Sequence, residues 1–462
     1  MAKRLVFCFD GTWNRLSAEV PTNVAKIAQM VRPVASGNTP QIVYYDEGIG
    51  TNTWFGRRWY EGATGKGLMS KLRSAYRFLI FNYEPGDQIY AFGFSRGAYT
   101  ARSFLGFIRH AGILDVVSAN KIDKAIALYR KAPAGVTGEE SGAAMRFRLR
   151  YCRGVCVSEK DREFRLRADP EMKGRDLPIL DLRYLGVWDT VSALGLPGFV
   201  PGARWLNRKY GFHDAVLTSK IARARHAIAI DEERPTFRHV PFGRAKVVEL
   251  NQRAAGQEAR AFAPWEEPYM EKWFPGVHGA VGGGGARRGL SDIALDWVLT
   301  GARRAGLELR EDDDAQTFSL SPNSLDHLRN SESSSRLLRA LERVRSVFHS
   351  PRQGPAEAEE IALPTYQRWF APASALPDGR LYRPGALKGM EAALDDWPHA
   401  RLPEYKSAHV VVRGDTLSAL AQDWYGDRAR YHEIFDANRD RIDDPDFIQA
   451  GTALRRPPAQ QT

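Results

Sequence analysis

Cysteine is scarce in this chain of 462 residues. Three cysteines are present, Cys8, Cys152 and Cys156, and three cannot build a disulfide framework. No second pair of Cys or His follows Cys152 and Cys156 at the spacing of a zinc site. We therefore expect three reduced, structural thiols, and a protein that works without a metal or an organic cofactor.

Long apolar runs are missing as well. A membrane-spanning helix needs about 18–20 apolar residues in a row, and no stretch of the sequence approaches that length. The run Leu5–Phe9 near the N-terminus is too short for a signal peptide and has no small-residue cleavage site. We therefore expect the chain in the cytoplasm of the producing cell, and any work outside the inner membrane to depend on delivery without a cleaved signal.

Charge is unevenly distributed along the chain. The formal net charge is +11, yet residues 409–457 hold seven arginines against nine acidic residues, a net charge of −2, which leaves +13 for the rest. One cationic cluster begins with Arg146–Arg153 and continues through Lys160 to Arg167, with aromatic and aliphatic residues between the cations. Such a cluster suits anionic lipid headgroups, and the solvated face of an amphipathic insertion explains it equally well. No nucleic-acid partner is expected.

In the first 120 residues, short apolar runs alternate with helical patterns. The expected strands are Leu5–Phe9, Gln41–Tyr45 and Gln88–Phe94, and the expected helices are Asn23–Val31, Gly67–Tyr83 and Ala98–His110. Strands separated by helices pair in parallel, because each connection must cross back over the sheet. We therefore expect an α/β fold with a doubly wound, mostly parallel sheet.

Composition divides the whole chain into three parts. A main domain is expected over residues 1–349, with a helical insertion at about 119–180 ahead of a fourth strand, Leu182–Trp188. Residues 350–406 are rich in Pro, Ala, Gly and Glu and are predicted to be a tail grading into a linker. Residues 407–458 form a compact C-terminal unit. Further helices are predicted at His213–Glu232, Leu290–Ala305, Ser324–Phe348 and Gly385–Trp397.

The clearest chemical motif is Gly93-Phe-Ser-Arg-Gly97, which has the form G-x-S-x-G. It follows an expected strand and opens an expected helix, so Ser95 lies at a sharp strand-to-helix turn. The serine backbone is strained in such a turn, and the flanking glycines remove Cβ atoms that would collide. We predict that Ser95 is a nucleophile and that the amide of Arg96 faces an oxyanion at the helix N-terminus.

A serine nucleophile needs a base and an acid that orients the base. Among the ten histidines, His278 follows a short apolar run, Trp273-Phe-Pro-Gly-Val, and three residues separate it from four consecutive glycines, Gly282–Gly285. These surroundings are typical of an exposed loop with close backbone approach. His278 is therefore the predicted base.

Two acids compete for the orienting role. Asp189 ends an apolar strand and would stand at its carboxyl end, where open α/β sheets place their sites. Asp231 lies 47 residues before His278, at the end of a helix or a short strand. We favour Asp189 and keep Asp231 as the alternative.

A second oxyanion donor is expected near the N-terminus. The run Phe9-Asp-Gly-Thr-Trp-Asn follows the first expected strand. The amides of Gly11 and Thr12 in this run are the predicted donors.

Six short motifs occur in order across about 300 residues. They are Phe9-Asp-Gly-Thr-Trp-Asn, Tyr44-Tyr-Asp-Glu-Gly-Ile-Gly-Thr, Gly93-Phe-Ser-Arg-Gly-Ala, Val187-Trp-Asp-Thr-Val, His226-Ala-Ile-Ala-Ile-Asp-Glu and Trp273-Phe-Pro-Gly-Val-His. This set resembles the α/β-hydrolase domain of bacterial type VI secretion phospholipase effectors. The resemblance implies hydrolysis of phospholipid acyl esters by a Ser-Asp-His triad, with Ser95 and His278 at matching positions. One position departs, because the family usually reads His-x-Asp-Val-Gly-Gly-Gly and Ala280 replaces the acid.

The C-terminal unit resembles the LysM peptidoglycan-binding module. The matching segments are Val410–Ala421, Trp424–Asp427, Ile434–Asn438 and Ile448–Leu454. A β-α-α-β pattern can be read independently, with the helices Leu417–Trp424 and Arg430–Asn438. The resemblance implies that N-acetylglucosamine polymers bind beside Gly414, Asp415, Thr416 and Leu417.

The residues predict a serine esterase, and the resemblance implies that its substrates are phospholipid acyl esters. The resemblance implies a secreted antibacterial effector that the LysM module targets to the cell envelope or periplasm. Expected partners are phospholipid, peptidoglycan, an anionic membrane surface, and a secretion-apparatus or immunity protein. The alternative is a catalytically weak wall-binding adaptor with the hydrolase domain as a docking scaffold, and Ala280 motivates it. The hydrolase is expected to be tethered to the module without having to touch it.

Overall fold

The structure is a computed structural model, and it describes most of the chain. The described residues are 2–11, 19–47, 66–131, 140–192, 216–310, 320–330, 350–395, 408–411, 414–439, 441–449 and 452–457. The chain divides into two compact units. The first holds residues 1–226, 235–250 and 301–318, and the second holds residues 227–234, 251–300 and 319–462.

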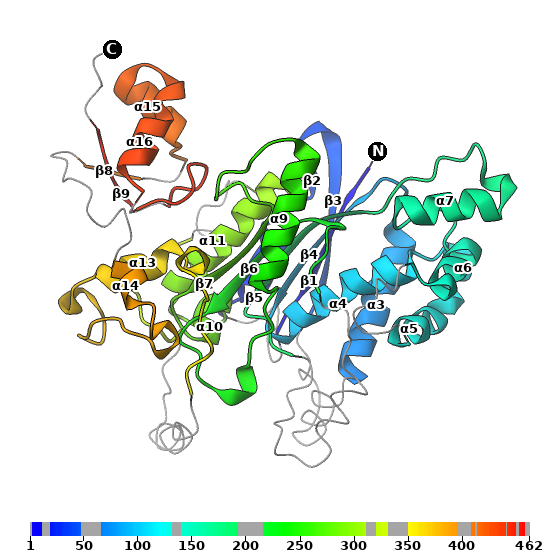
Figure 1. The fold of residues 1–462 in the computed structure, drawn as a ribbon, viewed down its shortest axis with the longest axis horizontal. Helices are drawn as coiled ribbons and strands as arrows, with labels where there is room; N and C mark the ends of the chain where they lie inside the picture. The colour runs from blue at the N-terminus through cyan, green and yellow to red at the C-terminus, as the bar shows by residue number, and fades with distance from the viewer. Residues whose placement is uncertain are drawn as a thin grey trace. The chain divides into compact units, whose positions relative to one another are not determined.

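Seven strands form one sheet in the order β2-β3-β1-β4-β5-β6-β7 (Figure 1). Their bounds are β1 Arg4–Phe9, β2 Val34–Ala35, β3 Thr39–Asp46, β4 Gln88–Phe94, β5 Asp181–Trp188, β6 Ile221–Ala229 and β7 Tyr269–Phe274. The pairs β1–β3, β1–β4 and β4–β5 are parallel, and β2 joins β3 antiparallel. The chain crosses from β3 on one side of β1 to β4 on the other, which is the doubly wound arrangement that the sequence predicts.

Helices connect and flank the strands. They are α1 Asn23–Met30, α3 Lys66–Asn82, α4 Arg96–Ala111, α5 Ile122–Arg130, α6 Gly142–Tyr151, α7 Glu159–Ala168, α9 Arg244–Glu258, α10 His278–Gly282, α11 Gly289–Arg304, α13 Leu363–Phe370 and α14 Glu391–Asp395. The predicted strands and helices of the first 120 residues are confirmed, as are the fourth strand and the helix at 290–305. Among the described residues, no helix is both long and apolar enough to cross a membrane.

The core of the first unit lies between the sheet and α4. Strand β1 is buried on both faces over Leu5–Phe9, as expected for a strand inside a parallel sheet. The ring of Phe104 on α4 lies 4.6 Å from Phe7 and 5.4 Å from Phe9, centroid to centroid. Aromatic packing therefore anchors α4 directly over β1.

One predicted helix is wrong. The sequence predicts a helix over 213–232, but the described part of that segment holds strand β6, in which Ala224 and His226–Ala229 are buried. Alanine and arginine favour helix as isolated residues. Burial against neighbouring strands overrides that preference. Strand β7 and helix α9 were not predicted, and most of the helix expected at 324–348 lies outside the described residues.

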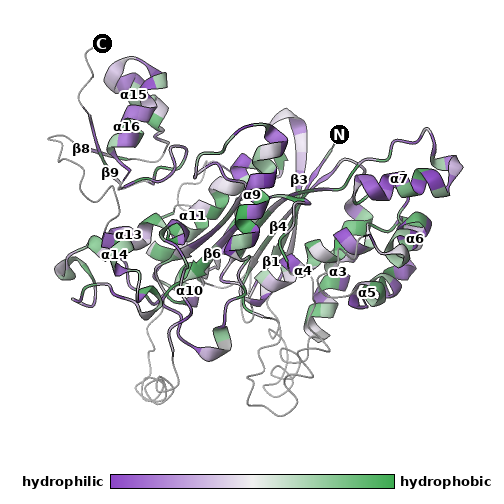
Figure 2. Cartoon of the chain, in the orientation of Figure 1, coloured by the Kyte–Doolittle hydropathy of each residue, from purple (hydrophilic) through white to green (hydrophobic). Residues whose placement is uncertain are grey.

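Ion pairs neutralise part of the positive charge of the basic cluster in the insertion. Arg148 and Arg165 are fully buried and share Asp161, at 3.0 Å and 2.8 Å. Nearby, Lys160 pairs with Glu140 at 2.9 Å. Helix α7 is hydrophilic along most of its length (Figure 2). Two of the cations therefore hold the insertion together rather than forming a free cationic face.

The segment from residue 350 to 395 is built into the second unit. Ile361 bridges to Trp273 of β7, and the amide of Ala362 donates to the carbonyl of Trp273 at 3.0 Å. Trp369 and Leu394 extend the same buried cluster. The predicted tail therefore packs against β7, and residues 396–407 lie outside the described part.

The C-terminal module has the predicted β-α-α-β order. Its elements are β8 Ala408–Val410, α15 Leu417–Tyr425, α16 Tyr431–Ala437 and β9 Ala453–Arg455, with β8 and β9 antiparallel. Within the second unit, the ring of Trp265 meets Phe435 at 4.8 Å, and the Gln367 amide donates to the carbonyl of Arg441 at 3.3 Å. The sequence predicts that the hydrolase need not touch the module, whereas these residues are in contact.

Candidate active site

Ser95 lies between the end of β4 and the start of α4. Its backbone has φ 60° and ψ −124°, which is the left-handed region that a non-glycine residue rarely adopts. The turn leaves no room at its flanking glycines. A Cβ at Gly93 would lie 2.5 Å from the carbonyl oxygen of Gly97, and a Cβ at Gly97 would lie 2.1 Å from that of Phe9. The strained turn that the motif predicts is present.

The strand order places Ser95 at a switch point of the sheet. Chain connections leave β1 toward β3 on one side and reach β4 on the other, so the strand order reverses at the carboxyl ends of β1 and β4. Gly97 packs against the carbonyl oxygens of Phe9 and Asp10 at the end of β1. Open α/β sheets bind their ligands at this location.

Asp189 directly follows β5, beside Ser95. Phe94 pairs with Trp188 in the ladder between β4 and β5, the Ser95 amide donates to the Trp188 carbonyl at 3.0 Å, and the Val191 amide donates to the Ser95 carbonyl at 3.3 Å. Asp189 is fully buried and has φ 39°, so its turn is also strained. Backbone hydrogen bonds therefore hold the favoured acid next to the predicted nucleophile.

His226 supports the Asp189 turn, a role that the sequence did not suggest. Its Nε2 accepts the amide of Thr190 at 3.1 Å, and its ring lies 5.0 Å from that of Phe242. The Val240 amide donates to the Thr190 carbonyl at 2.7 Å. The position 37 residues after Asp189 carries no local pattern that would reveal this contact, because β6 was predicted as a helix.

The predicted oxyanion donors have different surroundings. The amide of Arg96 is the first of α4 and belongs to the N–H groups that a helix cannot pair internally. The amide of Gly11 donates to Oδ1 of Asp10 at 2.6 Å, so this donor is engaged within the chain. Oδ2 of Asp10 accepts hydroxyls from Thr22 at 2.6 Å and Tyr45 at 2.7 Å. Thr12 lies outside the described residues.

His278 begins the short helix α10 in the second unit. The sequence predicts an exposed loop, but His278 is buried, with 6% of its surface exposed. Its backbone amide donates to Oε2 of Glu232 at 3.3 Å. Two residues earlier, Gly276 has φ 110°, where a Cβ would lie 2.8 Å from the Cβ of Ala280. Ala280 is thus packed against the turn that leads to His278.

Asp231, the alternative acid, is bonded to the same loop. Its Oδ2 accepts the Gly276 amide at 2.6 Å and the Tyr382 hydroxyl at 2.8 Å. Its own amide donates to the Gly276 carbonyl at 3.2 Å. Burial raises the pKa of the Asp231 carboxyl to about 6, although both hydrogen bonds and the charge of Arg368 act in the opposite direction. Asp231 is therefore bonded to the loop backbone and to Tyr382.

Glu232 was not singled out by sequence reasoning. The Arg234 guanidinium donates two hydrogen bonds to the Glu232 carboxylate, one to each oxygen, both at 2.7 Å. Burial alone would raise the pKa of Glu232. The hydrogen bonds and charge of Arg234, with the charge of His278, hold that pKa below its ordinary value. Glu232 is thus an ionised, anchored carboxylate that bonds to the His278 backbone.

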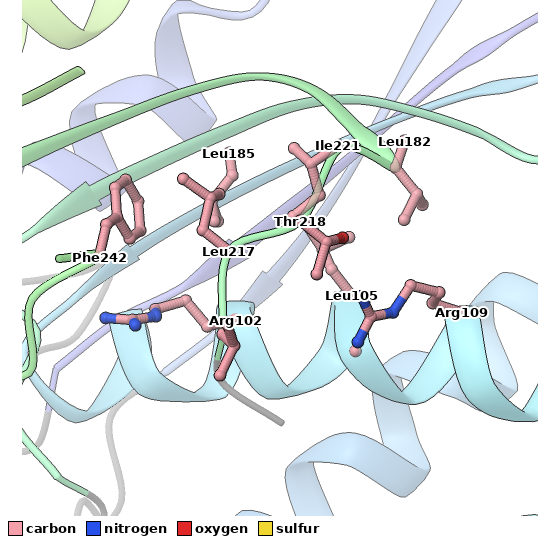
Figure 3. A pocket seen from close by; sticks show the side chains of 11 residues that line it. Arg102, Leu105, Arg109, Leu182, Leu185, Leu217, Thr218, Ile221 and Phe242 are labelled. Atoms are coloured by element: carbon pink, nitrogen blue, oxygen red, sulfur yellow. The ribbon is translucent and has the colours of Figure 1, made fainter. Parts of the chain in front are cut away.

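A cavity beside α4 is too small for an ester substrate (Figure 3). Two buried arginines of α4, Arg102 and Arg109, line it together with apolar side chains. Arg102 donates to the Pro241 carbonyl at 3.1 Å and lies over the ring of Phe242. The free volume is about 10 Å³, which is room for one water molecule. Arg102 therefore braces the loop before α9.

The predicted glycan residues surround the start of α15. Gly414 is exposed with φ 91°, and the Asp415 carboxylate lies 2.7 Å from Nε2 of His409. The Thr416 hydroxyl caps the helix by accepting the Ala419 amide at 3.1 Å. The side chain of Leu417 is buried in the module core, so only its backbone is left to meet a glycan.

A strained serine after a parallel strand defines an α/β-hydrolase-like protein. Residues 3–301 match the model of the type VI secretion phospholipase effector Tle1-like catalytic domain, and residues 409–457 match the LysM domain model. The chain belongs to the Tle1-like phospholipase effector family, and it carries a C-terminal LysM domain.

Two curated proteins share parts of the chain. The uncharacterized protein YEL023C of Saccharomyces cerevisiae is 26% identical over 253 residues, which is 52% of this chain and 33% of that protein. The potassium binding protein Kbp of Escherichia coli is 38% identical over 74 residues, which is 16% of this chain and 49% of that protein. The matches thus span between a third and a half of these relatives.

Solved structures show weaker likeness. A Tle1 effector bound to the VgrG spike of a type 6 secretion system is 18% identical and has a TM-score of 0.32, over 61% of this chain and 51% of that chain. An uncharacterized protein from Pseudomonas aeruginosa is 17% identical and has a TM-score of 0.37, over 97% of this chain and 64% of that chain.

Proposed function

We propose that the chain is a serine hydrolase that cleaves acyl esters of phospholipids. The strained backbone of Ser95 at the β4–α4 turn is the observation that carries this proposal. A turn that requires glycine on both sides of a serine is typical of the nucleophile turn of α/β-hydrolases, which supports this role for Ser95. Membership of a phospholipase effector family supports the substrate class.

In the proposed mechanism, the Ser95 hydroxyl attacks the ester carbonyl while His278 accepts its proton. The tetrahedral oxyanion is stabilised by the amide of Arg96. Collapse of this intermediate expels the alcohol, to which His278 returns the proton, and leaves an acyl group on Ser95. Water then attacks the acyl-enzyme with the same residues in the same roles, and the fatty acid leaves.

Asp189 is the proposed acid that fixes the tautomer of His278. It is fully buried at the carboxyl end of β5, and its turn is bonded to the backbone of Ser95 and to His226. Asp231 has its carboxylate bonded to Gly276 and Tyr382. We favour Asp189 because its turn is bonded to the Ser95 backbone, whereas the Asp231 carboxylate is bonded to the loop at Gly276 and to Tyr382.

The LysM domain is proposed to bind peptidoglycan and to concentrate the enzyme at the cell envelope. Because the family is one of type VI secretion effectors, we propose delivery through that apparatus into a target cell, with an immunity protein as a further partner. Gly414, Asp415 and Thr416 are the proposed glycan-contact positions.

Covalent labelling tests the hydrolase proposal. A fluorophosphonate probe should label Ser95 in the full chain, and Ser95→Ala should abolish both labelling and fatty-acid release from phosphatidylglycerol vesicles. His278→Ala should lose most of the labelling. A folded chain that shows no Ser95-dependent labelling or release, yet sediments with peptidoglycan, would instead identify the wall-binding adaptor.

A further inference from the structure

Two consecutive carboxylates follow β6 and bond to the loop that carries His278. The loop runs from Pro275 to His278 between β7 and α10. Asp231 accepts the amide of Gly276, and Glu232 accepts the amide of His278. Alternate backbone amides of the loop are therefore held by neighbouring side chains.

Asp231 bonds to Gly276 through both its side chain and its backbone. Its side chain accepts the Gly276 amide at 2.6 Å, and its backbone amide donates to the Gly276 carbonyl at 3.2 Å. Gly276 has φ 110°, a conformation that other residues rarely adopt. Such a strained residue persists where surrounding bonds over-determine its conformation.

The tail contributes a third anchor to this turn. The Tyr382 hydroxyl donates to Oδ2 of Asp231 at 2.8 Å, and the guanidinium of Arg368 lies 5.3 Å from the Tyr382 ring centroid. The Asp231 carboxyl is faced by the charges of Arg368 and Glu233. The segment predicted to grade into a linker therefore helps to hold the loop.

Glu232 is itself held in place by Arg234. Arg234 donates three hydrogen bonds to the Glu232 carboxylate, two from its guanidinium at 2.7 Å and one from its backbone amide at 2.9 Å. Glu232 is 2% exposed, and the charged groups that face it are Arg234 and His278. The hydrogen bonds from Arg234 therefore fix the position of the carboxylate that accepts the His278 amide.

We infer that Glu232 is a positioning residue for His278, and that Asp231 fixes the turn on which Glu232 acts. This inference rests on the proposed role of His278 as the base. Glu232 neither touches the reacting atoms nor replaces Asp189. It sets the position of the His278 backbone through the hydrogen bond that it accepts from the His278 amide.

The test compares Glu232→Gln with Glu233→Gln in the full chain, using a soluble short-chain ester. The neighbouring Glu233 is exposed, and it offers a matched loss of one carboxylate. Glu232→Gln should lower kcat about 10- to 100-fold with little change in KM, because a small displacement of the base costs turnover more than binding. Glu233→Gln should leave kcat and KM within about twofold of the values for the unmodified chain.

Arg234→Gln provides an independent variant in case Glu232→Gln does not fold. Its guanidinium is partly exposed, so folding should survive while Glu232 loses its anchor. A several-fold drop in kcat is expected here as well. Equal kinetics for Glu232→Gln and Glu233→Gln, or unchanged kinetics for Arg234→Gln, would overturn the positioning role. Absence of Ser95-dependent turnover in the unmodified chain would remove the proposed function itself, which keeps the two failures apart.

Discussion

The turn at Ser95 and the loop at His278 are held in place by different means. At Ser95, the backbone that packs beside the turn holds it in place. Gly97 lets α4 approach the end of β1, and the amide of Ser95 bonds to the adjacent strand. At His278, side chains hold the loop, since the carboxylate of Glu232 accepts the His278 amide.

This difference separates two ways of building an active site. Backbone sterics require glycine at fixed positions beside the serine, so they appear as a short motif and tolerate no added atom, even though the backbone that Gly97 meets, at Phe9, is distant in sequence. Side-chain anchors depend on segments brought together by the fold, and each can be altered singly with a graded effect. The predictions below probe this contrast, in order of decreasing effect.

The two candidate acids give the largest expected difference. Asp189→Asn should lower kcat by about 10³- to 10⁴-fold, because an amide presents the wrong hydrogen-bond partner to the imidazole. Asp231→Asn should stay within about tenfold, since an amide oxygen can still accept from Gly276 and Tyr382. Steady-state kinetics on a soluble ester measure kcat for both variants, and circular dichroism confirms that each variant is folded. The reverse ranking would make Asp231 the triad acid.

A methyl group at Gly97 should disrupt the Ser95 turn. The Cβ of Gly97→Ala would lie 2.1 Å from the Phe9 carbonyl oxygen, so α4 must shift. We expect the free energy of unfolding to fall by about 3 kcal/mol or more, the upper end for overpacking. Urea unfolding measures the change.

Gly256→Ala on α9 is the matched control, because no atom lies within 4 Å of its added Cβ. That variant should gain about 0.5–1 kcal/mol from helix propensity. Equal stabilities of the two variants would contradict the packing argument.

Asp231 should make the stability of the chain depend on pH. Its pKa is about 6 in the folded chain, above the ordinary value of 3.8, so the folded state binds this proton more tightly. The resulting stabilisation is full below about pH 4 and is lost as pH rises through about 6. Asp231→Asn does not titrate, so its advantage over the unmodified chain should grow from near zero at pH 4 to at most about 3 kcal/mol at pH 8.

Urea unfolding from pH 4 to pH 8 measures this dependence. Glu233→Gln is the exposed comparison: it removes the smallest of the contributions that act on the pKa of Asp231, so its pH dependence should be only slightly weaker than that of the unmodified chain. A difference between Asp231→Asn and the unmodified chain that stays constant over this range would exclude a raised pKa at Asp231.

Removal of the module should have the smallest effect on chemistry. A chain that ends at residue 405 should hydrolyse soluble esters within about twofold of the full chain, but should no longer sediment with purified peptidoglycan. The module has a hydrophobic core of its own, so residues 406–462 alone should still sediment. An inactive but folded truncated chain would show that the contacts of Trp265 and Gln367 couple module and hydrolase mechanically.

Much of the first unit could be predicted because its patterns are local. Strand β4, Ser95 and α4 follow one another in 24 residues, from Gln88 to Ala111, and each is specified by its own apolar period or glycine. Strand β6 could not be predicted in this way. Its Ala-Arg-Ala-Arg sequence favours helix in isolation, and only burial in the sheet makes it a strand.

By itself, the sequence determined the parallel sheet, the serine turn, the module and the family, because each depends on short-range sterics, periodicity or ordered motifs. Tertiary structure alone decided how Asp231, Glu232 and Tyr382 are used. The Tyr382 hydroxyl meets a carboxylate 151 residues away, and no local pattern can encode such a contact. A buried carboxylate requires hydrogen-bond partners, and the fold supplies them from whichever segments pack beside it.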